Sequence, residues 1–529
     1  MKKLFKYTGM AFLAASLLSA CTDNFEDMNT NPKGVSDEEL KQDNNFVGMH
    51  FVPMMKSIYF NESNGIWEYQ LIQNLNADMW SGYFSTATAF AGNVNNITYA
   101  MNAGWNDYCW NYAYGQVMAQ NLKVIEKCEG DAAYDHFVAI NTIIRVVTMS
   151  RLVDQYGCII YSKYGQSATG GVYDSGVDAY KLFFTELRDA ADVLRTAMTK
   201  EVASFGPFDM AYNGDLSKWA KLCNTLRLRL AMRVVKYDAA WAQSEAEAAM
   251  ADSNGLIESN DANFTISGRG YTNPLYGVCY SYGDCMLSAN VSSILGGMKD
   301  GRLEKMATAM GGQEIIGIRN GIDGLAQDHR GLYSAFVAKP TLTNTSAAIL
   351  ATAAETILLE AEAALRGWNV NGKGTAKELY EKGITVSFEQ WGASLGDYLS
   401  GTTGAAPYVD TVIPEASIEG QNDVTAVWDE ALTPEEKLAK IATQRWIAIY
   451  PEGMNGWAEV RRTGYPKLIP VMVNYSQGEV DTNLGPRRLP FTIDEKDNNS
   501  AEYAKAVQML GGPDNAGTRI FWDVDRPNF

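Results

Sequence analysis

Aromatic and amide side chains, two residue types that suit sugar binding, gather in two stretches of this sequence. The first holds Trp67, Tyr69, Trp80, Tyr83, Phe84, Phe90, Tyr99, Trp105, Tyr108 and Trp110 among Asn74, Asn76, Asn93, Asn95 and Asn96, and the second holds Tyr271, Asn273, Tyr276, Tyr280 and Tyr282. Flat rings stack on the CH-rich faces of sugars, and amide groups pair with hydroxyl groups. The pattern therefore predicts a surface that binds carbohydrate.

A subset of these residues forms the candidate ligand site: Trp80, Tyr83, Phe84, Asn93, Arg269, Asn273, Tyr276, Tyr280 and Tyr282. They lie in long insertions between expected helices, where a rigid scaffold can present loops. The competing interpretation is that the rings pack the insertions onto the helices. In that case the site lies elsewhere, around Arg319 and Asn320 or in the segment 396–433.

Motifs for catalysis or metal binding are absent from the sequence. His50, His136 and His329 lie far apart, and there is no His-Glu-x-x-His or Cys-x-x-Cys motif. Gly-Ala-Ser-Leu-Gly at 392–396 has the letters of a hydrolase nucleophile motif, but a helix is expected before it instead of a strand. The glycine-rich segment 367–373 lacks the hydroxyl residue of a phosphate loop. We expect no catalytic residue, metal or cofactor.

The amino terminus has the pattern of an export signal. Lys2, Lys3 and Lys6 precede a short apolar run, and Leu-Ser-Ala-Cys at 18–21 closes it. The run is too short to span a bilayer, so residues 1–20 are predicted to be a signal peptide. The ending is similar to a bacterial lipobox, in which Cys21 is acylated. The alternative is an ordinary secretory signal with a chance cysteine. Residues 21–42 are polar and are predicted to be a lipidated tether.

Charge and cysteine usage narrow the function classes further. The formal net charge is −18, with no run of basic residues, which disfavours a nucleic-acid partner. The scattered cysteines are unlike a disulfide scaffold, and several lie in apolar helical stretches. Only Cys279 and Cys285 are spaced as possible bridge partners.

Helical periodicity dominates the rest of the chain, and the expected helices form pairs. Residues 106–128 pair with 131–156, 177–198 with 216–236, and 346–366 with 375–391. Thr433-Pro434-Glu435-Glu436 is a capping box that opens a further helix. Irregular segments are expected at 65–104, 259–290, 311–344 and 396–433. The predicted fold class is mostly α, with tetratricopeptide-like helix pairs, long loop insertions and a few short strands, in one domain over 43–529.

Several motifs together resemble the SusD/RagB-like outer-membrane nutrient-binding lipoproteins. They are the lipobox, Asn-Thr-Asn-Pro at 29–32, Glu-Thr-Ile-Leu-Leu-Glu-Ala-Glu-Ala-Ala-Leu-Arg-Gly-Trp at 355–368, Gln-Arg-Trp-Ile-Ala-Ile-Tyr at 444–450, Gly-Trp-Ala-Glu-Val-Arg-Arg-Thr-Gly-Tyr-Pro at 456–466, Leu-Gly-Gly-Pro-Asp at 510–514 and Thr-Arg-Ile-Phe-Trp-Asp at 518–523. The resemblance runs over nearly the full length.

The resemblance implies a lipid-anchored surface protein that captures oligosaccharides. Its partner would be a TonB-dependent, SusC-like outer-membrane transporter, and its anchor a lipid on Cys21. Some members bind peptides instead, and no catalytic or sugar-binding residue carries over by motif. Two other classes remain open: a surface glycoside hydrolase with paired carboxylates, and a structural or adhesive surface protein.

Overall fold

The computed structural model describes residues 37–59, 65–167, 170–309, 314–333, 335–337 and 342–529. The predicted signal peptide, Cys21 and most of the predicted tether lie outside these residues. Two short helices, α3 (Asp37–Lys41) and α4 (Asn45–Gly48), belong to an amino-terminal unit. Residues Met49–Phe529 form one compact unit, which carries all the features described below.

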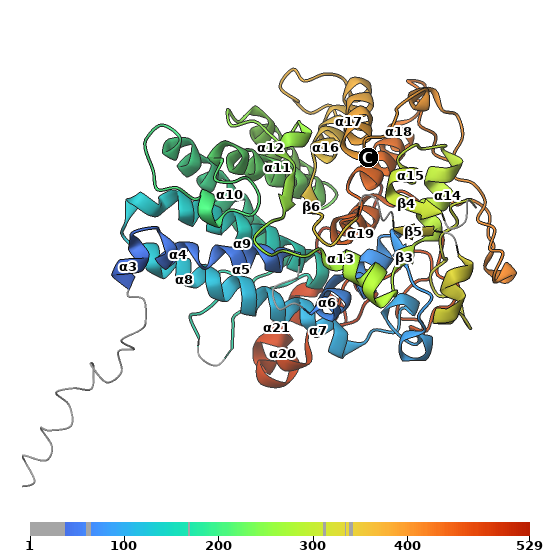
Figure 1. The fold of residues 1–529 in the computed structure, drawn as a ribbon, viewed down its shortest axis with the longest axis horizontal. Coiled ribbons are helices and arrows are strands. Elements are labelled where there is room, and N and C mark those ends of the chain that lie inside the picture. The colour runs from blue at the N-terminus through green and yellow to red at the C-terminus, as the bar shows by residue number, and fades with distance from the viewer. Residues whose placement is uncertain (1–36, 60–64, 168–169, 310–313, 334, 338–341) are drawn as a thin grey trace, which may run out of the picture. The chain divides into compact units, whose positions relative to one another are not determined.

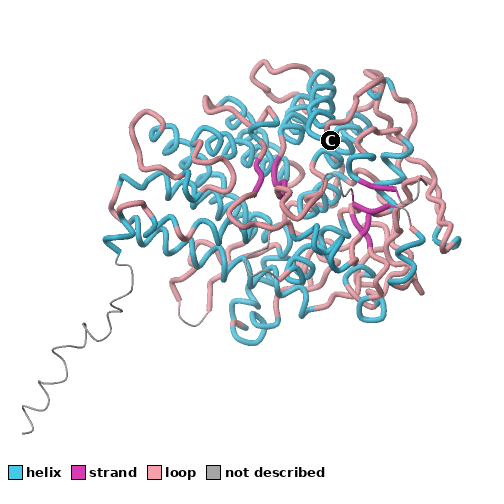
Figure 2. Tube along the Cα trace, viewed as in Figure 1, coloured by secondary structure: helices cyan, strands magenta, loops and turns pink. Residues whose placement is uncertain are grey.

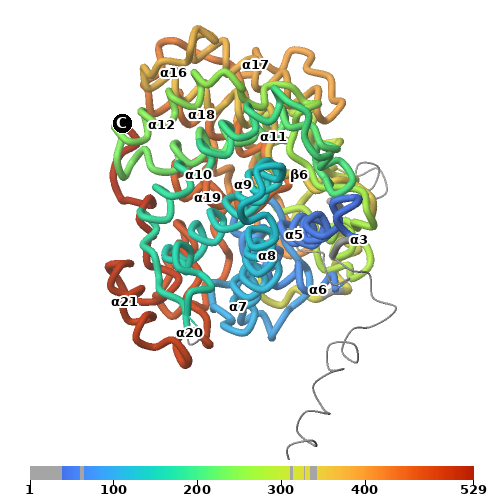
Figure 3. The backbone as a smooth tube through the Cα atoms, turned by 90° about the vertical axis from the view of Figure 1, so that its left-hand side faces the viewer, coloured from blue at the N-terminus to red at the C-terminus, as the bar shows by residue number. Residues whose placement is uncertain are grey.

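Antiparallel helix pairs make up the scaffold of this unit (Figure 1). The pairs are α8 (Ala119–Cys128) with α9 (Asp135–Tyr156), α10 (Gly176–Ala197) with α11 (Leu216–Val234), and α16 (Ala353–Leu365) with α17 (Ala376–Trp391). Helix α9 also packs on α10, and α11 packs on α12 (Ala239–Ala251), so successive helices form a continuous layer (Figure 3). The predicted mostly helical fold with paired helices is confirmed.

Side-chain caps explain where several of these helices begin. Ser175 accepts a hydrogen bond from the backbone N–H of Asp178 at the start of α10. Thr375 and Thr433 form capping boxes at α17 and α18 (Pro434–Ala448). Each cap satisfies backbone N–H groups that have no partner within the helix. The capping box predicted at Thr433 is therefore confirmed.

In the described part of the chain, short strands form three antiparallel pairs within the helical body (Figure 2). They are β1 (Phe84–Ser85) with β3 (Met286–Leu287), β2 (Phe264–Ile266) with β6 (Ala348–Ala351), and β4 (Ala307–Ala309) with β5 (Ala335–Val337). Strand β6 occupies the first part of the helix predicted over 346–366, so that helix starts only at Ala353. Thr352 is its amino-terminal cap, and the residues before it are extended because they pair with β2.

The remaining helices lie mainly in the insertions and near the carboxyl terminus. They are α5 (Phe51–Ile58), α6 (Ile66–Tyr69), α7 (Ala103–Tyr112), α13 (Pro274–Tyr276), α14 (Ala289–Gly297), α15 (Leu303–Met306), α19 (Gly453–Thr463), α20 (Ile493–Asn498) and α21 (Ser500–Leu510). Three π-helical runs accompany them among the residues that the structure describes: η1 (Gln70–Asp78), η4 (Ala113–Met118) and η8 (Gly277–Tyr282). One stretch, Ala132–Tyr156, is long and apolar enough to cross a bilayer, but most of it is buried inside the protein, as in a core helix.

The segment 65–104 was predicted to be irregular, and for its first part this is wrong. Helix α6 runs directly into η1, so residues 66–78 are helical. This helix could not be recognised from the sequence because its buried face is polar. Asp78 accepts hydrogen bonds from Tyr69 at 2.6 Å and from Gln73 at 2.9 Å, and Asn76 donates to the carbonyl of Ile72 at 2.9 Å. Such internally satisfied groups can be buried without the apolar stripe that a helix prediction needs.

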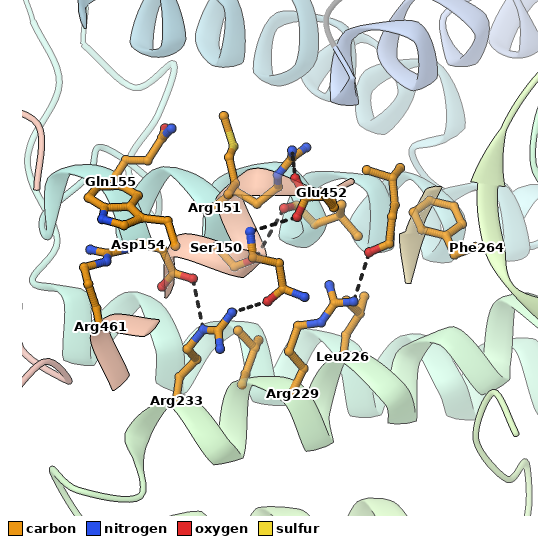
Figure 4. Close-up of a pocket in the computed structure, with 16 residues that line it drawn as sticks. Ser150, Arg151, Asp154, Gln155, Leu226, Arg229, Arg233, Phe264, Glu452 and Arg461 are labelled. Atoms are coloured by element: carbon orange, nitrogen blue, oxygen red, sulfur yellow. Dashed lines mark hydrogen bonds and ion pairs between the residues drawn. The ribbon is translucent and has the colours of Figure 1, made fainter. Parts of the chain in front are cut away.

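Ion pairs fill the centre of the scaffold (Figure 4). Arg229 of α11 pairs with Glu355 of α16 at 2.6 Å, and Arg233 of α11 pairs with Asp154 of α9 at 3.4 Å. The cavity among these side chains has a volume of about 30 Å³. Ligand pockets are roughly ten times larger. These charges therefore hold helices together and do not form a binding site.

Candidate functional site

Helices α6, α7 and α13 lie near one another (Figure 1), and α6 also contacts η8. A group of partly exposed aromatic rings lies on these elements. We call this group the aromatic face, and its members are Trp67, Tyr108, Tyr276, Tyr280 and Tyr282. The elements meet closely because Gly277 has no side chain: a Cβ there would lie 2.6 Å from atoms of Ile66. This contact places the segment that carries Trp67 against the segment that carries Tyr276, Tyr280 and Tyr282.

Two rings of the aromatic face expose much of their surface, and the other members with Trp67 form two ring pairs. The exposed fraction is 44% for Trp67 and 39% for Tyr282. Trp67 meets Tyr108 edge to face with ring centroids 5.3 Å apart, and Tyr276 lies 5.2 Å from Tyr280 at a tilt of 39°. Ring pairs of this kind hold each other in a fixed orientation. The face can therefore stack on the apolar side of a ligand with little rearrangement.

Polar contacts fix the backbone that carries these tyrosines. Asp284 accepts hydrogen bonds from Gln70 at 3.1 Å and from Thr88 at 2.7 Å, which links the end of η8 to the η1 segment. Arg330 donates to the carbonyl of Cys279 at 3.1 Å. π-Helical turns are rare and often occur at functional sites. Here one such run carries Tyr280 and Tyr282, and a second directly follows α6.

The predicted residues of the second stretch separate into two groups. Tyr276, Tyr280 and Tyr282 lie together on the aromatic face. Asn273 is buried; its side chain caps α13 and donates to the carbonyl of Ser346 at 3.2 Å. Arg269 is exposed and donates to the carbonyl of Gly206 at 2.9 Å. The structure therefore gives Asn273 a role in shaping the loop.

Two predicted residues of the first stretch, Tyr83 and Phe84, belong to the core. Tyr83 is fully buried, donates to the carbonyl of Trp446 at 2.5 Å and lies 4.8 Å from the ring of Trp446. Phe84 is also fully buried and packs on Tyr450. Both were predicted to contact ligand, and in the structure no part of either ring reaches the surface. Their packing agrees with the competing interpretation, in which rings pack the insertions onto the helices.

Trp80 and Asn93 keep some exposed surface but lie outside the aromatic face. Trp80 is 7% exposed, its Nε1 donates to the carbonyl of Asn96 at 2.9 Å, and its ring packs 4.9 Å from that of Trp457. It is not part of the aromatic face, but its edge lines a separate pocket. Asn93 is half-buried and donates to the carbonyl of Ile322 at 3.3 Å.

Arg319 and Asn320, which were considered as an alternative ligand site, also have partners within the protein. Arg319 donates to the carbonyls of Pro470 and Ala416 at 3.0 and 3.1 Å, which ties the segment 396–433 to the body. Asn320 donates to the carbonyl of Met79 at 3.1 Å and lines the same pocket as Trp80.

Cys279 and Cys285 are free thiols, so the disulfide considered for them is not formed. Both are buried, and burial raises the pKa of the Cys279 thiol well above its usual value. The cysteines at 109, 128, 158 and 223 are also free and buried, as small apolar side chains are.

Carboxyl groups with raised pKa values lie beneath the surface. Burial raises the pKa of Asp78 to about 6 and that of Glu360 to about 8. A general acid for glycoside hydrolysis needs a raised pKa and must also reach the glycosidic oxygen. Asp78 and Glu360 have no exposed surface. In the part of the chain that the structure describes, no group of three or more His, Cys, Asp and Glu side chains is arranged to hold a metal ion.

Sequence reasoning did not select Trp67 and Tyr108 as ligand contacts, although both lie in the aromatic-rich first stretch. Helix α6 has only four residues before the π-helical run, which is too short to show a periodicity. The alternation of buried Glu68 and Tyr69 with exposed Trp67 becomes visible only in the structure.

The protein is thus a scaffold of paired helices, and the insertions between the pairs carry exposed aromatic rings. The chain belongs to the SusD-like family, described as SusD and RagB outer-membrane lipoproteins, whose family model matches residues 27–523. The family resemblance read from the sequence is thereby confirmed.

Solved structures agree with this assignment. A chitin-binding SusD homologue from Flavobacterium johnsoniae is 43% identical with a TM-score of 0.87, over 91% of this chain and 100% of that one. SusD homologues from Bacteroides vulgatus and Bacteroides uniformis are 37% and 32% identical, with TM-scores of 0.87 and 0.81; the alignments cover 93% and 90% of this chain and 100% and 99% of theirs. A comparison with curated proteins finds no match.

Proposed function

We propose that this protein is a cell-surface lipoprotein that captures oligosaccharides without cleaving them and delivers them to a TonB-dependent, SusC-like transporter. The observation that carries the proposal is the aromatic face, where Trp67 and Tyr282 expose ring surface. Stacking and hydroxyl pairing require no nucleophile, general base or metal. Membership of a family of outer-membrane lipoproteins supports the location.

The first ligand class to test is chitin fragments, because the Flavobacterium relative is a chitin-binding protein. N-acetylglucosamine rings offer apolar faces for Trp67 and Tyr282, and their acetamido groups offer hydrogen-bond partners. Binding of the chitin tetrasaccharide is measured by calorimetry beside the cellulose tetrasaccharide and an unrelated tetrapeptide. We expect the chitin fragment to bind, and chromatography to find it uncut.

Matched variants make this experiment specific to the aromatic face. Trp67→Ala and Tyr282→Ala are expected to weaken binding at least several-fold. Tyr237→Ala removes a ring that is 40% exposed elsewhere and is expected to leave binding unchanged. Unaltered affinity in both face variants would place the site elsewhere. Cleaved product would favour the glycoside hydrolase, and preference for the tetrapeptide would favour a peptide-binding member of the family.

Anchoring and partnership need their own tests. Cys21→Ala is expected to abolish lipid labelling and release the protein from the membrane fraction, because a cleaved signal peptide leaves no anchor. The anchored protein is expected to co-purify with a large outer-membrane barrel. Membrane retention of the variant would contradict the lipid anchor, and purification without a barrel would favour the adhesive alternative.

A further inference from the structure

A second concave site lies at the carboxyl-terminal side of the scaffold. It has a volume of about 520 Å³ and is lined by α19 together with parts of the segments 464–471, 482–487 and 519–528. Ligand pockets typically have volumes of about 300–1,000 Å³. We call it the basic pocket, after the cationic residues in its wall: Lys236, Arg461, Lys467, Arg487, Arg519 and Arg526.

The basic pocket and the aromatic face have no residue in common. Figure 3 places the carboxyl terminus at one edge of the scaffold and α6 at the opposite edge. The pocket wall includes Asp525, Arg526 and Asn528 near that terminus. A ligand in the basic pocket would therefore not occupy the aromatic face.

The charge of the pocket is opposite to that of the whole protein. The chain has a formal net charge of −18, but Asp525 is the one carboxylate among the residues that line the pocket. Behind the wall, buried Asp523 pairs with Arg487 and Arg519 and neutralises part of the positive charge. The other cations remain, and a concave site lined by one sign of charge attracts ligands of the opposite sign.

Arg461 is the most unusual wall residue, because it is 3% exposed and incompletely paired. Its Nη1 donates to the carbonyl of Arg487 at 2.7 Å, whereas its Nε and Nη2 have no hydrogen-bond partner. The guanidinium lies 3.5 Å from the ring centre of Trp457 and 4.8 Å from that of Trp522. Burial lowers the pKa of Arg461 to about 9. Unused donors on a buried cation are costly, and an anion would satisfy them.

Lys236 adds a second cation, whose nearby charges are Asp523 and the guanidinium groups of Arg462, Arg487 and Arg519. Its side chain is half-buried in the turn that follows α11, and among the described residues its ammonium group forms no hydrogen bond or ion pair. Burial, followed by the positive charge of Arg462, lowers the pKa of Lys236. An anion held between Lys236 and Arg461 would supply hydrogen-bond acceptors and a negative charge to both groups.

The rest of the wall suits a sugar ring. The indoles of Trp80 and Trp457 both line the pocket, as does Asn320. The Oδ1 atom of Asn320 is buried without a hydrogen-bond partner, although its Nδ2 is used. A hydroxyl group would satisfy Oδ1, and apolar CH groups would pack on the indole edges.

We propose that the basic pocket binds an acidic saccharide, whose carboxylate or sulfate group is held by Lys236 and Arg461 and whose ring contacts Trp80 and Asn320. This site is independent of neutral-glycan capture on the aromatic face. Either anion fits the planar donor set of an arginine, and the two are separated by experiment.

Calorimetry with glucuronate, glucose 6-sulfate and glucose tests the proposal on the full mature chain. We expect at least one acidic sugar to bind ten-fold or more tightly than glucose, and the tighter of the two identifies the preferred anion. Lys236→Gln is expected to weaken that binding at least five-fold. Arg526→Gln, at an exposed rim position, is expected to weaken it about two-fold and serves if Lys236→Gln does not fold.

Two controls separate this site from other sources of binding. Lys123→Gln removes an exposed cation on α8, and Trp67→Ala removes a ring of the aromatic face; both are expected to leave acidic-sugar binding unchanged. Acidic sugars that bind no more tightly than glucose would overturn the proposal. Affinity that is equal in the parent and in every folded pocket variant would also overturn it.

Discussion

Arg462 and Glu362 form a bidentate ion pair in the centre of the scaffold. Nη1 of Arg462 donates to Oε1 of Glu362 at 2.8 Å, Nη2 donates to Oε2 at 2.6 Å, and neither side chain has exposed surface. Glu362 also accepts from Arg445 at 3.2 Å. The pair joins α16 to α19, and Arg445 adds α18. Positive neighbours outweigh burial and hold the pKa of Glu362 well below its usual range.

Removing Arg462 should therefore be costly. Arg462→Met leaves Glu362 and Glu459 buried with fewer counter-charges, and we expect the free energy of unfolding to fall by about 3–5 kcal/mol. Denaturant unfolding measures this change. As a control, Arg188→Met breaks an exposed pair with Asp189 and should cost less than about 1 kcal/mol. Equal effects of the two substitutions would contradict a structural role for the buried pair.

Close packing between α16 and α17 gives a second prediction. Ala354 and Ala361 are fully buried on α16, and a Cβ at Gly383 of α17 would lie 2.7 Å from Leu358. Ala361→Leu should overpack this contact and lower the free energy of unfolding by about 1–3 kcal/mol. The matched change Ala248→Leu, at an exposed position of α12, should leave the melting temperature nearly unchanged. A normal melting temperature for Ala361→Leu would mean that this face tolerates more volume.

The helix pairs could be predicted because their apolar stripes and caps are local signals. The stripe of α11 and the capping box at Thr433 depend only on spacing along the chain. Helix α6 with η1 could not be predicted in this way, since the burial of Asp78 depends on partners such as Tyr69 and Gln73 that only the folded chain brings into place.

The candidate site was only partly predictable for a related reason. Composition indicates a surplus of rings but does not say which rings are covered. Tyr83 and Tyr282 have the same side chain in similar insertions, yet Trp446, more than 350 residues along the chain from Tyr83, covers only Tyr83. The basic pocket could not be predicted from the sequence because its cationic residues lie in separate segments of the chain.

A pH-dependent effect should arise at Glu360. Lys373 contacts both Glu360 and Glu258, and the two carboxyl groups lie close enough to share one proton. Burial is the largest cause that raises the pKa of Glu360 from 4.5 to about 8. Because the folded state holds this proton more tightly than the unfolded chain, its stabilising contribution is fully present below about pH 4.5 and is lost as the pH rises through about 8.

Glu360→Gln should remove that dependence, because the amide cannot ionise. We expect the parent protein to lose up to about 1 kcal/mol per pH unit relative to the variant between pH 5 and 8. Urea unfolding midpoints at several pH values measure the difference, and titrating groups that do not contact Glu360 cancel in the comparison. Parallel stability curves for the two proteins would show that Glu360 is already ionised in the folded state.

Replacing Tyr83 and replacing Tyr282 by alanine should have opposite effects on stability and on saccharide binding. Tyr83 is enclosed by Trp446 and Tyr450, so Tyr83→Ala should lower the free energy of unfolding by roughly 3–5 kcal/mol. Tyr282 is 39% exposed, so Tyr282→Ala should change stability little and weaken saccharide binding several-fold. Thermal unfolding and calorimetry on the same samples separate stability from affinity. If Tyr282→Ala destabilised the fold as much as Tyr83→Ala, the ring would be structural and the aromatic face would lose one of its two most exposed members.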